Sequence, residues 1–262
     1  MWLAKSKHQK KSPLIYKPLR LAGQSLDEEI RRLNENFLFN WATVAVLIVC
    51  LAVSEWLKWY YAMPPQPIPI TTLAVMAIFA VAWRFFRFRT QIRLLKLGRD
   101  GERVVGECLD ELREKGYKVF HDLVGGDFNV DHVIIGPSGV FTIETKTISK
   151  PVKRDARITY TDGQLKADGR VFERNPISQV RAGAQWIKKI LKESTGKEFH
   201  VHPVVLFPGW FIEPMPHKLS AEVWILEPKA LPKFLENQPA ILPAEDISLA
   251  SYHLSRYVRS SY

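Results

Sequence analysis

The chain has 262 residues, enough for one large domain or for an ordinary domain with a smaller addition. Its formal net charge of +10 favours an anionic partner, and both nucleic acid and anionic lipid fit that description. The two cysteines, Cys50 in an apolar run and Cys108 in a predicted helix, argue against a disulfide framework.

Residues 1–36 form a basic arm. The arm contains Ser25-Leu26-Asp27-Glu28, a capping-box pattern in which the serine and the glutamate side chains each satisfy a free backbone amide. The pattern predicts a short helix at the end of the arm. The positive charges of the arm suit contact with anionic lipid headgroups.

Residues 37–86 contain two apolar stretches, at about 37–57 and 68–86, with a proline-rich connection between them. The first stretch carries no charge as far as Ser54 and is about as long as a membrane span. Aromatic residues crowd the ends of both stretches, as in the interfacial belts of membrane proteins. The pattern predicts a transmembrane helical hairpin, and the alternative is a pair of helices buried in the protein.

The charges that flank this hairpin predict its orientation. Basic residues precede the first stretch and follow the second, whereas the connection offers only Glu55 and Lys58. The positive-inside rule then places both termini on the cytosolic side. We therefore expect an integral protein of the cytoplasmic or inner membrane, with the lipid bilayer as one partner and a cytosolic C-terminal domain.

Residues 97–262 have the pattern of an α/β domain with a C-terminal extension. Apolar periodicity and turn residues predict helices at 101–115, 175–194, 231–236 and 247–258, and strands at 117–123, 129–135, 140–148, 201–207 and 223–226. Two Asp-Gly pairs within 158–172 add a small meander. This order of elements indicates a mixed central sheet flanked by helices.

Two carboxylates and a lysine come from strands that we expect to be neighbours. Asp131 lies in one strand, and Glu144 and Lys146 lie two residues apart in the next, so these two share a face. Such residues often form surface ion pairs, but unpaired carboxylates are costly in strands this apolar, which favours a functional role. Magnesium is usually held by one or two carboxylates and lowers the pKa of an attacking water. Lys146 could orient that water or stabilise developing negative charge.

Several motifs surround these residues, namely Gly101-Glu102, Gly106-Glu107, Gly116-Tyr117, Phe128-Asn129-Val130-Asp131-His132, Gly136-Pro137-Ser138-Gly139 and Ile143-Glu144-Thr145-Lys146. In this combination the region from about residue 97 to 210 resembles the nuclease-related domain, NERD. That family is similar to the PD-(D/E)XK nucleases, with Asp131 at the Asp and Glu144-Thr145-Lys146 at the E-x-K of the signature. The resemblance implies a restriction-endonuclease-like core and cleavage of nucleic acid, with DNA favoured over RNA, assisted by Mg²⁺ or Mn²⁺.

The same resemblance implies roles for two further residues. Glu107 matches the glutamate in the first helix of related nucleases, where it would join Asp131 and Glu144 as a metal ligand. Gln179 matches the glutamine that follows an Asn-Pro turn. His132 should face the other side of its strand from Asp131, and we interpret it as structural.

The sequence leaves other functions open. A catalytically inactive module of the same fold could bind nucleic acid or a protein partner at the membrane. Basic residues between Arg154 and Lys192 could track a phosphate backbone or simply form a solvated face. In a third interpretation, the small residues of the second apolar stretch would let the hairpin pair with partner helices.

Overall fold

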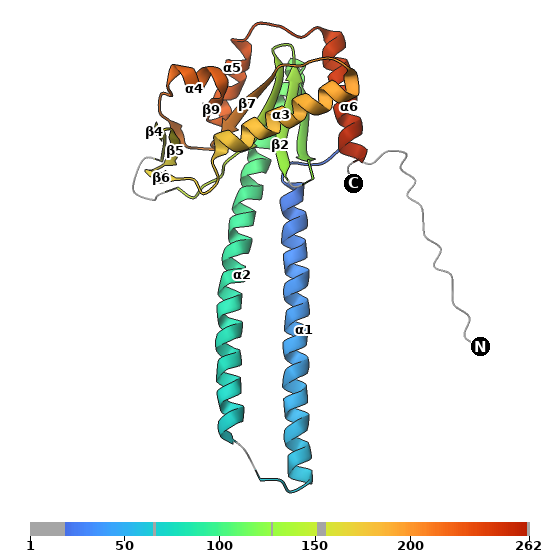
Figure 1. Ribbon diagram of the computed structural model, residues 1–262, viewed down its shortest axis with the longest axis vertical. Coiled ribbons are helices and arrows are strands. Elements are labelled where there is room, and N and C mark those ends of the chain that lie inside the picture. Colours follow the sequence, from blue (N-terminus) through green and yellow to red (C-terminus); the bar gives the residue numbers. More distant parts are fainter. Residues whose placement is uncertain (1–18, 65–66, 127, 151–155, 261–262) are drawn as a thin grey trace, which may run out of the picture.

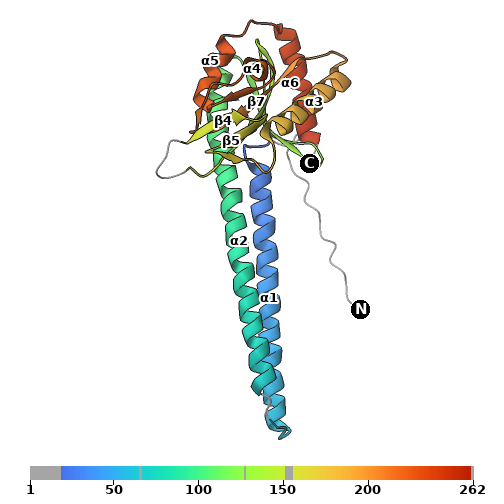
Figure 2. The same ribbon diagram turned by 60° about the vertical axis from the view of Figure 1, so that its left-hand side comes forward.

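The computed structural model describes residues 19–64, 67–126, 128–150 and 156–260. The chain forms a two-helix stalk that carries an α/β domain at one end (Figure 1). Helix α1 (Gln24–Tyr60) leads away from the domain, and α2 (Pro67–Asp110) returns to it. The helices lie side by side in both views (Figure 2), and the rings of Phe37 and Phe88 stack between them with centroids 4.1 Å apart.

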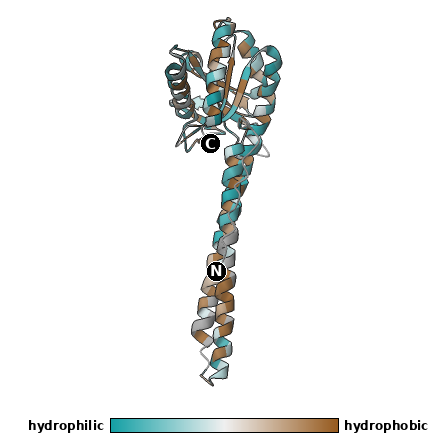
Figure 3. Ribbon diagram, turned by 90° about the vertical axis from the view of Figure 1, so that its right-hand side faces the viewer, coloured by the Kyte–Doolittle hydropathy of each residue, from teal (hydrophilic) through white to brown (hydrophobic). Residues whose placement is uncertain are grey.

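The stalk corrects the prediction of a transmembrane hairpin at residues 37–86. Among the residues that the structure describes, no helix has the length and apolar character needed to cross a membrane. Both helices continue beyond the predicted spans into charged turns at their domain ends, where Figure 3 shows mainly hydrophilic residues. The predicted integral membrane localisation, with its cytosolic orientation and lipid bilayer partner, is corrected by the same finding.

The predicted short helix of the basic arm is instead the beginning of α1. The helix starts at Gln24, and Gly23 occupies the N-cap position with φ 73° and no side-chain cap. The side chains of Ser25 and Glu28 do not form a capping box, because both accept hydrogen bonds from Arg20. Residues 1–18 of the arm lie outside the described residues, as does Arg154.

A five-stranded mixed sheet forms the centre of the domain, in the order β1-β2-β3-β7-β9. Strands β1 (Lys118–Val124), β2 (Asn129–Gly136) and β3 (Gly139–Thr145) are antiparallel, and β7 (Val201–Leu206) and β9 (Trp224–Leu226) extend the sheet in parallel to β3. The continuous apolar runs of β2 and β3 are explained by burial on both faces.

Helices cover both faces of this sheet. On one face, α3 (Pro176–Thr195) and α6 (Ala244–Ser260) contribute Ile187 and Leu254 to the core. On the other face, the end of α2 and the short α5 (Leu231–Glu236) contribute Leu109 and Leu235. The helix predicted at 101–115 is thus the last part of α2 and the 3-10 turn η1 (Glu111–Lys115), which Gly116 closes at φ 86°.

The predicted meander forms a second sheet, in the order β6-β5-β4-β8. Both Asp-Gly pairs make its turns, since Asp162 and Asp168 adopt φ values of 55° and 49°. The strands are β4 (Arg157–Thr161), β5 (Gln164–Ala167), β6 (Arg170–Val171) and β8 (Phe211–Ile212). The remaining elements are α4 (His217–Glu222) and the 3-10 turn η2 (Pro228–Ala230).

Two glycines allow helices to approach the end of the central sheet closely. A Cβ atom on Gly101 of α2 would lie 1.6 Å from Oγ1 of Thr147, just beyond β3. A Cβ atom on Gly183 of α3 would lie 3.1 Å from Cγ2 of Val130 in β2. The helices α2 and α3 therefore converge on the end of the sheet where β2 begins and β3 ends.

Candidate active site

The structure brings Asp131, Glu144 and Lys146 together at this end of the sheet. Oδ2 of Asp131 accepts a 2.7 Å hydrogen bond from the backbone N–H of Thr145, the residue after Glu144. Nζ of Lys146 lies 2.6 Å from Oε1 of Glu144. Lys146 follows the last residue of β3, and its own N–H donates to the carbonyl oxygen of Leu206 at 2.9 Å. The strand alternation used to predict this group thus agrees with the observed contacts.

A third carboxylate, that of Glu102 on α2, belongs to the same group. Its neighbour Gly101 packs directly on Thr147, so Glu102 reaches the junction between stalk and domain, where it is half-buried. The charges of Glu102 and Glu144 act on one another and on Asp131. We refer to Glu102, Asp131 and Glu144 below as the acidic cluster.

The structure does not bring Glu107 to the acidic cluster, although the resemblance implied a role there. Glu107 is exposed, and its charge acts on the nearby thiol of Cys108. Helix periodicity indicates that Glu102 faces the domain. It stands three residues before the buried Val105 and seven before the buried Leu109, and so shares their face of the helix. The prediction of Glu107 came from the family resemblance, which placed the first-helix glutamate at the second of the two Gly-Glu pairs.

Burial and mutual repulsion raise the pKa values of this cluster. Burial, together with the charges of Glu144 and Glu102, raises the pKa of Asp131 well above its usual value, against the opposing effects of the Thr145 N–H and Lys146. Burial, together with the charges of Asp122 and Glu144, raises the pKa of Glu102 to about 8. Loss of a proton from Asp131 or Glu102 is therefore unfavourable in the cluster alone, and a bound cation would favour it.

The raised pKa of Glu102 predicts how stability depends on pH without divalent cations. In the unfolded chain, Glu102 loses its proton near pH 4.5, whereas in the folded protein it keeps the proton up to about pH 8. Between these two pH values the folded state therefore binds more protons than the unfolded state. The contribution of Glu102 to the free energy of unfolding should therefore be present below about pH 4.5 and be lost as pH rises through about 8. Urea unfolding of the full chain between about pH 4.5 and 8 measures how steeply the free energy of unfolding changes with pH.

The matched variants for this measurement are Glu102→Gln and Glu107→Gln. Glutamine cannot ionise, so Glu102→Gln should reduce the pH dependence of the free energy of unfolding and leave the part that comes from Asp131. Glu107→Gln should keep the wild-type slope because Glu107 is exposed. Equal slopes in wild type and Glu102→Gln would contradict the prediction.

The donor set of the cluster fits a magnesium or manganese ion. These ions take oxygen ligands, and Mg²⁺ commonly keeps several waters beside one or two carboxylates. Over the described ranges, no three His, Cys, Asp or Glu side chains form a ready metal-binding group. Buried hydroxyl oxygens of Thr145 and Thr147 have no hydrogen-bond partner within the same ranges. The residues therefore suit a hydrated cation rather than one enclosed by protein ligands.

Gln179 lies near the beginning of α3, four residues before Gly183, and so shares the helix face that packs on β2. Asn175 caps this helix by accepting a 3.0 Å hydrogen bond from the N–H of Ile177, as the Asn-Pro pattern predicts. The side-chain oxygen of Gln179 is buried without a partner among the described residues. The structure turns Gln179 toward the sheet, while a direct role at the cluster stays a prediction.

His132 lies beside Asp131 in sequence but belongs to a separate buried pair. Its Nδ1 lies 2.9 Å from Nδ1 of His121, and Nε2 of His121 lies 3.2 Å from Oδ1 of Asp110. Burial lowers the pKa of both imidazoles, which keeps them neutral so that one ring can donate to the other. This arrangement agrees with the interpretation of His132 as structural.

Comparison with known proteins identifies one family. Residues 97–208 match the family model of the nuclease-related domain, NERD. The matched region includes the end of α2, the strands β1 to β3, α3 and β7, and therefore the whole acidic cluster and Lys146. No curated protein and no solved structure matches the chain.

Proposed function

We propose that this chain, which carries a nuclease-related domain at residues 97–208, hydrolyses phosphodiester bonds of nucleic acid with the help of Mg²⁺ or Mn²⁺. The observation that carries the proposal is the acidic cluster itself. Glu102, Asp131 and Glu144 come from α2, β2 and β3 and their charges act on one another, while Lys146 contacts Glu144. Three carboxylates held together repel one another, and a bound cation would relieve that repulsion.

Each residue of the site has a role that follows from its contacts. Glu102, Asp131 and Glu144 would hold the cation, and the N–H of Thr145 keeps the Asp131 carboxylate in place. The cation, when bound, supplies charge neutralisation at the phosphate and lowers the pKa of a bound water. The Lys146 side chain is 23% exposed, so Nζ can reach a water or a phosphate oxygen while it contacts Glu144.

The proposed substrate class follows from the charge of the chain and from the family resemblance. A net charge of +10 supports an anionic polymer as substrate. The preference for DNA over RNA rests on the resemblance to the PD-(D/E)XK nucleases. Both polymers therefore belong in the first experiment.

The full chain is expected to cleave plasmid DNA in the presence of Mg²⁺ or Mn²⁺. Chelation with EDTA should abolish cleavage, and excess Mn²⁺ should restore it, because the carboxylates alone cannot activate a water. Gel analysis of supercoiled plasmid, linear DNA and RNA measures the activity and its substrate. Salt-sensitive binding of nucleic acid without cleavage by either cation would contradict hydrolysis and favour the non-catalytic binding module.

The variants that test the site are Glu144→Gln and Glu102→Gln, with Glu107→Gln as the matched control. Loss of one carboxylate from the cluster should lower the cleavage rate at limiting Mn²⁺ by at least about 100-fold. Glu107→Gln should cleave at close to the wild-type rate because its side chain is exposed and outside the cluster. A large loss in Glu107→Gln with activity retained in Glu102→Gln would reverse the assignment.

A further inference from the structure

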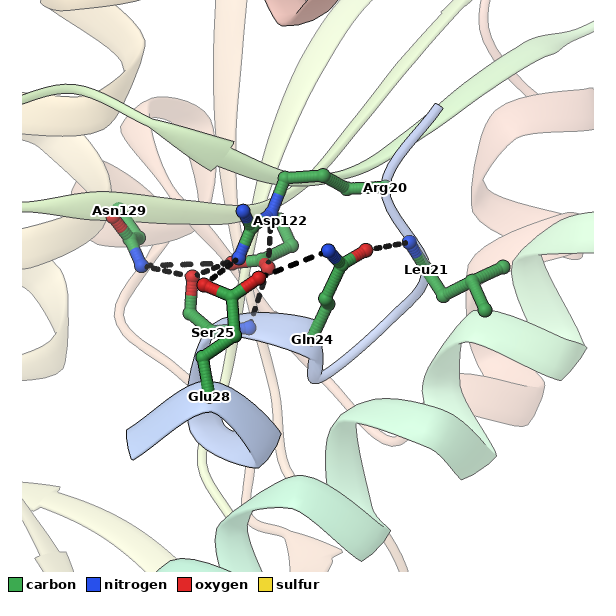
Figure 4. Close-up of polar contacts among 7 residues, drawn as sticks. All are labelled: Arg20, Leu21, Gln24, Ser25, Glu28, Asp122 and Asn129. Atoms are coloured by element: carbon green, nitrogen blue, oxygen red, sulfur yellow. Dashed lines mark hydrogen bonds and ion pairs between the residues drawn. The ribbon is translucent and has the colours of Figure 1, made fainter. Parts of the chain in front are cut away.

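A buried ion pair fixes the segment before α1 to the central sheet (Figure 4). Nε of Arg20 donates to Oδ2 of Asp122 at 2.7 Å, and each side chain is 3% exposed. Nη2 of Arg20 also donates to Oγ of Ser25 at 2.8 Å and to Oε2 of Glu28 at 3.2 Å. The stalk helix α1 therefore starts from a fixed point on β1.

Ser25 and Asn129 extend this anchor from α1 to the strand that carries Asp131. The backbone N–H of Ser25 donates to Oδ2 of Asp122 at 2.7 Å. Nδ2 of Asn129, two residues before Asp131 on β2, donates to Oγ of Ser25 at 2.7 Å. We call Arg20, Ser25, Asp122 and Asn129 the N-terminal latch.

Asp122 holds an unusual backbone conformation within β1. It adopts φ 51°, a left-handed value that non-glycine residues keep only where the surroundings impose it. The pairing register runs from His121–His132 to Leu123–Val130 and omits Asp122–Asp131 between them. Carboxylates directly opposite each other on a sheet repel. The left-handed conformation and the bonds from Arg20 and Ser25 together give Asp122 partners other than Asp131.

The strand alternation around Asp122 shows the effect of this conformation. The ring of His121 lies near Gly106 of α2, on one face of the sheet. Leu123 packs in the cluster beneath α3 and α6, on the opposite face. Residues two apart in a regular strand share a face, so Asp122 reverses the alternation.

The latch also contacts the turn of α2 that carries Glu102. Gly23 lies between Arg20 and Ser25, in a turn that packs on α2 at Arg99, three residues before Glu102. One turn further along α1, Asp27 pairs with Arg99 at 3.1 Å and with Arg103, on either side of Glu102 in sequence. A Cβ atom on Gly23 would lie 3.0 Å from Cγ of Arg99, so the turn fits tightly against α2.

We propose that Arg20 and Asp122 are positioning residues, which fix the Gly23 turn against α2 at Arg99 and thereby hold the turn of α2 that carries Glu102 next to β2 and β3. The inference rests on the proposed function, in which these three carboxylates bind a divalent cation. Arg20 also neutralises Asp122, whose charge acts on Glu102. In this proposal the position of Glu102 in the cation site depends on how the start of α1 is fixed to the sheet.

The experiment measures Mn²⁺ binding by the full chain through the electron paramagnetic resonance signal of free Mn²⁺. The test variant is Arg20→Gln/Asp122→Asn, which removes both charges together and leaves neither one buried alone. We expect cooperative thermal unfolding and a Kd for Mn²⁺ raised by about tenfold or more, as for the loss of groups that orient metal ligands. Ser25→Ala, which removes only one hydroxyl of the latch, should raise the Kd in the same direction with a smaller change in stability.

The matched control is Arg181→Gln/Glu222→Gln, which removes an ion pair between α3 and α4 away from Glu102. Its Kd for Mn²⁺ should equal that of the wild type. If the latch acts through Glu102, adding Arg20→Gln/Asp122→Asn to Glu102→Gln should weaken Mn²⁺ binding no further.

The outcomes separate the latch from the proposed function. Additive losses with Glu102→Gln, or unchanged Mn²⁺ affinity in both Arg20→Gln/Asp122→Asn and Ser25→Ala, would overturn the positioning role and leave the cation site intact. Unchanged Mn²⁺ affinity in Glu102→Gln and Glu144→Gln would overturn the cation site and the latch inference together.

Discussion

Replacement of Lys146 by alanine is expected to lower the rate of phosphodiester cleavage by about 100- to 1000-fold, the usual effect of removing one donor that stabilises developing charge. Nζ of Lys146 lies 2.6 Å from Glu144, and its charge also acts on Asp131 and Glu102. Alanine removes the donor that would orient a water or meet a phosphate oxygen. Single-turnover cleavage of plasmid DNA at saturating Mn²⁺ measures the loss.

The binding of Mn²⁺ distinguishes this effect from loss of the cation. Lys146 repels a cation, so Lys146→Ala should bind Mn²⁺ at least as tightly as the wild type while its cleavage rate falls. Lys115→Ala, which removes an exposed ion pair with Glu236, is the matched control and should retain full activity. Cleavage at the wild-type rate by Lys146→Ala would show that Lys146 has no part in the chemistry.

The single substitution Arg20→Gln is expected to lower the free energy of unfolding by about 3–5 kcal/mol, as when one partner of a buried ion pair is removed. Asp122 would stay buried at 2% exposure and keep its left-handed backbone without the guanidinium that compensates its charge. Urea denaturation of the full chain measures the difference.

The double substitution Arg20→Gln/Asp122→Asn provides the control for this prediction. It removes the uncompensated carboxylate, so most of the lost stability should return. Arg181→Gln removes a cation that is 45% exposed and should change the free energy of unfolding by no more than about 1 kcal/mol. A loss in Arg20→Gln as small as that in Arg181→Gln would contradict a structural role for the buried pair.

The position of Asp131, Glu144 and Lys146 could be predicted because strand geometry is local. Alternation along the predicted strand 140–148 places Glu144 and Lys146 on one face, and the Gly136–Gly139 turn makes β2 and β3 neighbours. The choice between Glu102 and Glu107 could not be made in the same way. Both are helical and follow a glycine. Helix periodicity puts Glu102 on the buried face of α2, and the packing of Gly101 on Thr147 shows that this face meets the end of β3.

The stalk is the part of the fold for which the prediction from the sequence was wrong. The apolar stretches at about 37–57 and 68–86 do fold as helices, but the transmembrane hairpin inferred from them was wrong for the described residues. Hydropathy reports the composition of a segment and not where its helix begins and ends. Contacts between the two helices, such as Asp27 with Arg99, lie in the parts of α1 and α2 beyond the apolar stretches.

The sequence by itself determined the strands, the turns and the candidate group of Asp131, Glu144 and Lys146, because each depends on residues close together along the chain. Only the tertiary structure decided that Glu102 completes the acidic cluster and that Arg20 pairs with Asp122, 102 residues away. Contacts at that separation depend on how helices and strands pack. A reversed strand alternation at Asp122 likewise has no local signal, since its left-handed backbone is held by partners from another element.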